Sequence, residues 1–316
     1  MTRFNAIAGF RTVCALESKG IFWFYFVLDS CEEGECLNQY IKEMRIKSWL
    51  KNILVFIPLV FSLELLNPEK LVMTVIAFCA FCLVSSAVYV FNDICDAEKD
   101  ESHPIKHTRP IASGLIPKKS AAGFAALLAA VGLTTGFAVG LLVMVLIATY
   151  ILLNLVYSMW IKHRPIFDCF CIAAGFVLRI YIGGVAGGEY ISDWLFLTVI
   201  AGSLFLAFGK RRGEMIRIAD SAITRKVLAS YDVQFLNGMV FVYAGLSVVF
   251  YALWAMYRGS NMIYTVPLII FLISKYLLLI HNNDSHGDPT TVIFKDKSLL
   301  VAAGLYSLLA IALLYL

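Results

Sequence analysis

Charge is scarce in this sequence of 316 residues: Lys, Arg, Asp and Glu together make up 15%, whereas apolar residues make up 60%. A soluble domain of this size does not need so much apolar surface, so a soluble globular protein is excluded. The alternating apolar and polar strands of a membrane barrel are also absent, which leaves helices as the spanning elements. The composition therefore predicts an all-α polytopic membrane protein.

Three other features are missing. The eight cysteines are scattered and form no paired Cys-x-x-Cys sets. No small-residue cleavage site follows the short apolar run 21–28, which argues against a signal peptide. No basic soluble module with interleaved aromatic residues is present, so the net charge of +4 is not interpreted as a nucleic-acid-binding surface.

Nine apolar segments are long enough, or nearly so, to span a bilayer core of roughly 30 Å. They cover residues 50–66, 70–91, 120–138, 140–158, 165–187, 194–209, 236–257, 262–281 and 299–316. Residues 45–316 are therefore expected to form one transmembrane catalytic domain. Residues 1–44 form an N-terminal extension, for which two interpretations stay open: a segment on the membrane surface, or a translation start at Met44.

Most of the 26 Lys and Arg residues lie in the N-terminal segment or in the connections after the second, fourth, sixth and eighth apolar segments. The positive-inside rule then places the N-terminus in the cytoplasm and the C-terminus outside the cell membrane. Polar residues close these four segments on the same side, where they can converge over a cavity that is open to lipid. We therefore expect an active site that faces the cytoplasm.

One polar stretch, residues 92–114, follows a long apolar segment and opens with Asn92, Asp93, Asp96 and Asp100. On a helix, spacings of three and four place the three carboxylates on one face. Like charges stacked in this way repel each other, so we expect a cation to hold them. Oxygen ligands favour a hard ion such as Mg²⁺, which keeps an open side for a substrate phosphate. The three aspartates are the predicted metal ligands; the alternative is a solvated loop.

Basic and polar residues near the same ends are candidate substrate-binding groups, because guanidinium and ammonium groups pair with phosphate oxygens. The candidates are Asn92, Lys47, Lys51, Lys106, Arg109, Tyr157, Lys162, Asp168, Arg179, Lys210, Arg211, Arg212, Glu214 and Lys275. Some have structural alternatives: Lys47 and Lys51 suit a headgroup anchor, and Arg179, deep in a segment, can pair with an acid. Positive-inside anchoring explains part of the run 210–212.

The pattern NDxxDxxxD at 92–100, after the second of nine apolar segments, resembles the UbiA superfamily of intramembrane prenyltransferases over roughly residues 45–316. The resemblance implies a helical bundle around a central cavity, in which Mg²⁺ holds a prenyl diphosphate. Members carry a second acidic motif, DxxxD, at the end of the sixth helix, where this sequence has GKRRGE. Four further stretches resemble the decaprenyl-phosphate phosphoribosyltransferase branch: HPIKHTRPIASG, YSxxxK together with Asp168 and GFVLR, FLAFGKRRGE, and YDVQFLNGM.

That branch implies Mg²⁺-dependent transfer of 5-phosphoribose from phosphoribosyl pyrophosphate to a polyprenyl phosphate of the decaprenyl type, with release of pyrophosphate and use in cell-wall synthesis. Asp93 and Asp96 are then the central catalytic residues, residues 210–212 bind the 5-phosphate or the lipid phosphate, and Glu214 stands in for the missing acidic motif. The donor assignment depends on the resemblance alone. Two alternatives stay open: prenyl transfer to an aromatic or glycerol-phosphate acceptor, and a transporter. Lipid chain length and homo-oligomerisation stay undetermined.

Overall fold

The structure is a computed structural model that describes residues 33–102, 106–218, 226–282 and 296–315. The short apolar run 21–28 lies outside the described residues. Every element found in these ranges is helical. In chain order the elements are α2 (Glu33–Glu43), η1 (Ile46–Phe56), α3 (Ile57–Phe61), α4 (Pro68–Glu101), η2 (Lys106–Thr108), α5 (Lys118–Val139), α6 (Leu141–Met159), η3 (Ile161–His163), α7 (Phe167–Gly187), α8 (Asp193–Ile218), η4 (Lys226–Ser230), α9 (Val233–Arg258), η5 (Ser260–Thr265), α10 (Val266–His281) and α12 (Lys297–Tyr315).

Eight helices of the described chain are long and apolar enough to cross a membrane. They are α4, α5, α6, α7, α8, α9, α10 together with its η5 lead-in, and α12, and they correspond to the second to ninth predicted segments. The prediction of an all-α integral membrane protein is therefore confirmed. The exact count of nine spans stays a prediction, because it depends on the first segment, 50–66.

That first segment forms the 3₁₀-helix η1 followed by the short helix α3. A 3₁₀-helix rises about 2.0 Å per residue and an α-helix about 1.5 Å, so the two together extend roughly 30 Å. At the η1 end, Arg45 contacts Asp93 near the end of α4. At the α3 end, the carbonyl oxygen of Val60 accepts a hydrogen bond of 3.2 Å from Tyr315, at the end of α12. The segment therefore runs from one end of the bundle to the other.

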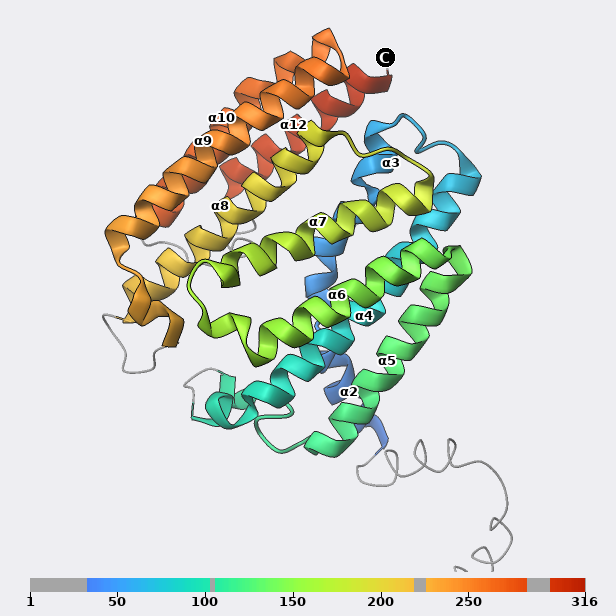
Figure 1. Cartoon of the computed structure of the whole chain (residues 1–316), viewed down its shortest axis with the longest axis vertical. Coiled ribbons are helices and arrows are strands. Elements are labelled where there is room, and N and C mark those ends of the chain that lie inside the picture. The colour runs from blue at the N-terminus through green and yellow to red at the C-terminus, as the bar shows by residue number, and fades with distance from the viewer. Residues whose placement is uncertain (1–32, 103–105, 219–225, 283–295, 316) are drawn as a thin grey trace, which may run out of the picture.

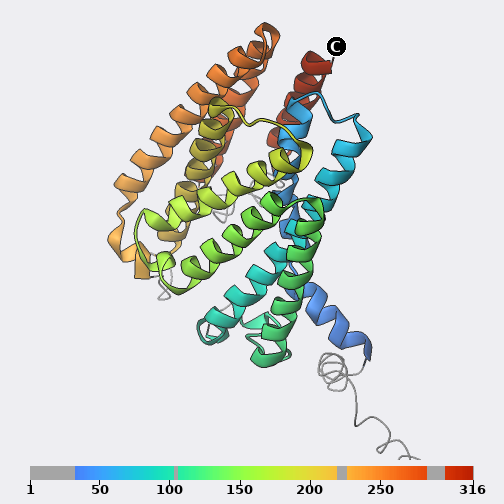
Figure 2. The ribbon, with the colours of Figure 1, turned by 45° about the vertical axis from the view of Figure 1, so that its right-hand side comes forward.

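The long helices form two groups, α4 to α7 and α8 to α12 (Figures 1 and 2). Helix α7 contributes to the buried apolar cluster of each group. It also packs closely against η1: a Cβ atom at Gly183 would lie 1.8 Å from the carbonyl oxygen of Val55. This crossing requires glycine, so a single residue without a side chain allows η1 to lie against α7.

Two helices, α4 and α8, continue beyond the C-terminal limits of the predicted segments. Helix α4 begins at Pro68, with Asn67 as N-cap accepting the Lys70 N–H, and its 34 residues extend about 50 Å. This length exceeds a bilayer core of roughly 30 Å, so the acidic turns extend past the apolar segment. Helix α8 does not end at 209 but continues to Ile218. The KRRGE residues are therefore helical, and helical phase decides which of them face the same neighbour.

Candidate active site

The acidic turns of α4 contain two buried aspartates and one that is partly exposed. Asp93 and Asp100 are each 4% exposed, whereas the Asp96 side chain is 33% exposed. Each helical residue adds about 100° of rotation, so positions 93 and 100 nearly coincide in direction while 96 is turned aside. Arg109 contacts both Asp93 and Asp100: its Nη1 donates to Asp93 at 2.9 Å and also to Asp100.

Arg45 is a second cation on Asp93, and it is not among the site residues predicted from the sequence. It connects α2 to η1 in the left-handed conformation, with φ 51°, which is uncommon for a residue with a side chain. Its guanidinium donates to both carboxylate oxygens of Asp93, at 2.6 Å for Oδ1, and lies over the Tyr89 ring. Arg45 belongs to a run with Lys and Trp residues that is typical of a membrane-interface anchor, so nothing in the sequence indicated its contact with Asp93.

The other two aspartates also face basic side chains. Lys162, in η3, donates to Asp96 at 2.8 Å, and Lys106 lies 3.6 Å from Asp100. The described residues contain no group of three acidic, histidine or cysteine side chains arranged to hold a metal ion. Asp96 faces η3, while Asp93 and Asp100 share Arg109, so the role of the three aspartates as ligands of one metal ion stays a prediction.

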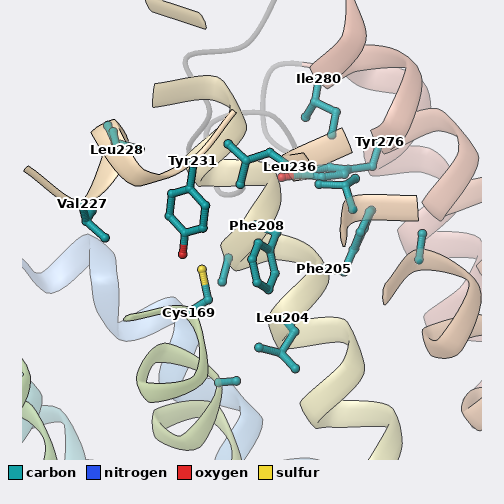
Figure 3. Packing of buried hydrophobic residues seen from close by; sticks show 14 residues of the cluster. Cys169, Leu204, Phe205, Phe208, Val227, Leu228, Tyr231, Leu236, Tyr276 and Ile280 are labelled. Atoms are coloured by element: carbon teal, nitrogen blue, oxygen red, sulfur yellow. The ribbon is translucent and has the colours of Figure 1, made fainter. Parts of the chain in front are cut away.

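A second charged cluster lies where α7 begins and α8 passes. Asp168 and Arg211 are almost fully buried and form an ion pair of 2.6 Å. Arg211 also donates to Glu214 at 2.6 Å, and the hydroxyl of Tyr231 donates to Asp168 at 3.0 Å. In Figure 3 the Tyr231 ring points its hydroxyl toward α7, beside the buried Cys169. Tyr231 was not a predicted site residue, although it begins the stretch YDVQFLNGM.

The last turn of α6 joins the two clusters. Ser158 donates a hydrogen bond to the side-chain oxygen of Asn92, next to Asp93 on α4. The preceding residue, Tyr157, accepts a hydrogen bond of 3.4 Å from Arg211. Because Tyr157 and Ser158 are adjacent, the acidic turns of α4 and the buried arginine of α8 lie at the same end of the bundle. Three of the four predicted polar helix ends, those of α4, α6 and α8, therefore lie together.

Comparison of the chain with known protein families identifies a match. Residues 53–295, well over half of the chain, match the UbiA prenyltransferase family. The chain belongs to the UbiA prenyltransferase family. The two sequence features that indicated this resemblance, the acidic turns and the KRRGE run, lie on α4 and α8.

Among UbiA-family relatives, the chain is 36% identical over 275 residues to the decaprenyl-phosphate phosphoribosyltransferase of Corynebacterium glutamicum, covering 83% of this chain and 82% of the relative. It is 33% identical to the protein of that name from Mycolicibacterium smegmatis, covering 83% and 87%. Its fold is similar to that of a UbiA homolog from Archaeoglobus fulgidus solved with GPP and Mg²⁺, with a TM-score of 0.70, 17% identity, and coverage of 88% of this chain and 100% of the other.

Some predicted site residues of this UbiA-family chain are not brought to either cluster. Arg179 is buried between η1, α4 and α6, where it donates to Asn52 at 3.0 Å and to the Gly175 carbonyl at 2.7 Å. Its guanidinium lies over the rings of Phe81 and Tyr150. Neither alternative for Arg179, a phosphate site or pairing with an acid, corresponds to these contacts, because aromatic faces and an amide surround the charge.

Arg212 and Lys275 also face away from Arg211. Arg212 donates to Asn237 on α9 and to the Ile280 carbonyl on α10, so it connects three helices. Lys275 lies 3.3 Å from Asp296, just before α12. Lys210 is half-buried on α8. Of the η1 lysines, Lys47 is exposed and Lys51 half-buried, and no ion pair to either is found in the described part of the chain.

Glu43, the last residue of α2, is a further group at this site, and it belongs to the predicted N-terminal extension. It is 2% exposed and accepts the backbone N–H of Ile111 at 3.2 Å. Burial, and next the charge of the neighbouring Asp93, raise the pKa of Glu43 to about 7. The extension therefore contributes a buried carboxyl group beside the acidic turns.

Proposed function

We propose that this UbiA-family enzyme transfers 5-phosphoribose from phosphoribosyl pyrophosphate to a polyprenyl phosphate and releases pyrophosphate. The observation that carries the proposal is the similarity, over more than four fifths of both chains, to relatives named decaprenyl-phosphate phosphoribosyltransferase. The basic residues on α8, where the family's second acidic motif is expected, support it. Such a reaction brings together a pyrophosphate, a 5-phosphate and a lipid phosphate, and so needs more cationic contacts than prenyl transfer.

The acidic turns of α4 are the proposed donor site. Their carboxylate oxygens are the ligand type that Mg²⁺ prefers, and one or two of them suffice when substrate phosphates and water complete the coordination. Asp93 would hold the ion, with Asp96 or Asp100. When bound, Mg²⁺ offsets the charge that develops on the leaving pyrophosphate. Arg109 and Arg45, which now neutralise these carboxylates, are within reach of the same pyrophosphate and supply hydrogen-bond donors to it.

The Asp168–Arg211 cluster is the proposed site of a second phosphate, either the 5-phosphate of the donor or the phosphate of the lipid. Asp168 and Glu214 fix the guanidinium of Arg211 from two sides. Tyr157 and Lys162 lie between this cluster and α4 and would contact both substrates. A fixed guanidinium loses little conformational freedom on binding, so its position favours one phosphate geometry.

The proposed reaction breaks one bond at ribose C1 and forms another. The bond between ribose C1 and the pyrophosphate oxygen breaks, and a phosphate oxygen of the lipid forms the new bond to C1. C1 passes through an oxocarbenium-like state, as in glycoside transfer. The lipid phosphate is already ionised at neutral pH, so no strong general base is required. The residues of the site therefore act chiefly by positioning the two anions and stabilising the leaving group.

The proposed location of the site is the cytoplasmic side of the cell membrane. The clusters occupy the end of the bundle at which the basic connections gather. A water-soluble phosphorylated donor is available from the cytosol, and the lipid phosphate arrives from the bilayer.

The reaction is tested with purified protein in lipid nanodiscs, given isotope-labelled phosphoribosyl pyrophosphate and decaprenyl phosphate, with mass spectrometry of the extracted lipids. We expect a lipid product heavier by one phosphoribosyl group. In parallel, labelled prenyl diphosphate is offered with an aromatic or a glycerol-phosphate acceptor. A product only in that second reaction would replace the proposed donor with a prenyl diphosphate.

A further inference from the structure

Helix α2 lies outside the stretch that matches the UbiA family, which begins at residue 53, yet it packs against the donor end of the bundle. Tyr40 is buried in an apolar cluster with Ile111, Ile116 and residues of α4 and α5. Its ring meets that of Phe124 edge to face, with centroids 5.0 Å apart. Figure 2 shows α2 at the end of the bundle where α4 and α5 are joined. The helix therefore belongs to the folded unit.

The end of α2 contacts the two parts of the donor site directly. Glu43 accepts the backbone N–H of Ile111 at 3.2 Å, and Arg45, two residues further on, donates to Asp93. The next residue, Met44, accepts a hydrogen bond of 2.7 Å from Ser86 through its carbonyl oxygen. Three successive residues, Glu43 to Arg45, thus connect to α4 or to the connection that follows it.

The connection after α4 carries Arg109, and Ile111 is only two residues further on. Ile111 is 4% exposed, so its N–H has no access to water and depends on Glu43 for a partner. A buried donor left without an acceptor is costly, and a local backbone shift is the usual relief. Such a shift would move Arg109 relative to Asp93. A single side chain on α2 therefore sets the separation of a basic and an acidic group of the donor site.

We propose that Glu43 is a positioning residue for the donor: it fixes the connection that bears Arg109 against Asp93, so that both can engage the same pyrophosphate group. This inference rests on the proposed function only in assuming a donor that carries a pyrophosphate. Both candidate donors do, whether the group transferred is phosphoribosyl or prenyl.

The test uses the full chain in detergent and measures binding of Mn²⁺ with inorganic pyrophosphate by electron paramagnetic resonance. Glu43→Leu removes the acceptor and replaces the carboxylate with an apolar side chain of similar size. Glu43→Gln retains an oxygen that can accept the Ile111 N–H. Leu37→Ala, on the exposed side of the same helix at 62% exposure, is the matched control.

We expect Glu43→Leu to weaken pyrophosphate binding about tenfold or more, and Glu43→Gln to stay within about threefold of the native protein. In turnover assays, Glu43→Leu should raise the KM of the donor by the same factor and leave that of the lipid nearly unchanged. Leu37→Ala should change neither quantity. Selective loss for the donor distinguishes positioning from a general weakening of the fold.

The inference is overturned if folded Glu43→Leu binds Mn²⁺ and pyrophosphate as the native protein does, or if it changes both KM values equally. Should the leucine variant not fold, Glu43→Ala replaces it under the same criteria, because alanine also removes the side-chain acceptor of the Ile111 N–H and adds no bulk. Failure of the proposed function gives a different result: the native protein then transfers no phosphoribosyl group, while the effect of Glu43→Leu on pyrophosphate binding persists.

Discussion

Asp93 lies between two cationic side chains, because the guanidinium groups of Arg45 and Arg109 both pair with it. An aspartate 4% exposed is retained at low cost only when such partners satisfy it. Mg²⁺ could take the place of the arginines on Asp93, and a substrate pyrophosphate could then pair with Arg45 and Arg109, so that no charge is left unpaired. At the residue scale, Arg45 and Arg109 neutralise Asp93 and would be available to a substrate anion once a metal ion binds the carboxylate.

Replacing Asp93 with Asn should lower turnover about a hundredfold or more, because a carboxylate that holds the metal is lost. The measurement is product formation with Mg²⁺ titrated. Glu98→Gln is the matched control, since Glu98 is on the same helix with a side chain 88% exposed, and it should keep nearly native activity. Near-native turnover of Asp93→Asn would remove Asp93 from the metal site.

Replacing Arg211 with Met should destabilise the protein by about 3–5 kcal/mol, because Asp168 is left as a buried charge without its cation. Thermal unfolding in detergent measures the loss. Adding Asp168→Asn to the same variant removes the isolated charge and should restore part of the stability. No restoration in the double variant would mean that packing of the arginine side chain, rather than charge, dominates.

The raised pKa of Glu43, about 7, predicts a pH dependence of stability in the presence of EDTA. The folded state holds the proton more tightly than the unfolded state, whose pKa is near the ordinary value of 4.5. This contribution is therefore complete below about pH 4.5 and is lost as the pH rises through about 7. The melting temperature of Glu43→Gln, subtracted from that of the native protein, should show this fall; a flat difference would contradict it.

At the element scale, the crossing of η1 over α7 decides where the N-terminal residues lie. Arg45 and Glu43 reach Asp93 only because η1 begins beside α4. Farther along, the same 3₁₀-helix places Asn52 against Ser85, at 3.0 Å, and against Arg179. A 3₁₀ segment of 11 residues is unusual, and its greater rise lets a short stretch extend across the bundle.

Gly183→Ala should therefore be strongly destabilising, by about 3 kcal/mol or more, because its Cβ atom would overlap the Val55 carbonyl and push η1 away from α7. Gly245→Ala, on α9 with no neighbouring atom within 4 Å of the added Cβ, should be neutral or slightly stabilising, since alanine favours helix. The melting temperatures of the two variants, compared with that of the native protein, measure these changes in stability. Equal values would mean that η1 can shift freely.

At the scale of the whole molecule, both charged clusters lie at one end, and Tyr315 of α12 lies near Val60 at the other. The predicted orientation, N-terminus in the cytoplasm and C-terminus outside, corresponds to an odd number of crossings. Eight long helices are found in the described chain, so this prediction requires that the η1–α3 segment also cross the membrane.

Reporter fusions test this orientation. If the predicted orientation holds, alkaline phosphatase joined after residue 316 should be active and a fluorescent protein at the same place should not fluoresce. Fusions after His281, at the end of α10, should give the reverse result because one crossing fewer precedes them. Two identical results would show that α12 does not cross the membrane.

The sequence by itself determined the helical membrane class, eight of the spanning segments and the acidic turns of α4, because hydropathy and helical spacing are local properties of the chain. Tertiary structure alone decided which side chains meet. Neighbouring helical residues differ by about 100° in direction, so Arg211 faces Asp168 whereas Arg212 faces α9 and α10. Glu43 and Arg45 reach Asp93 from about fifty residues away in sequence, a contact that depends on how η1 packs against α7.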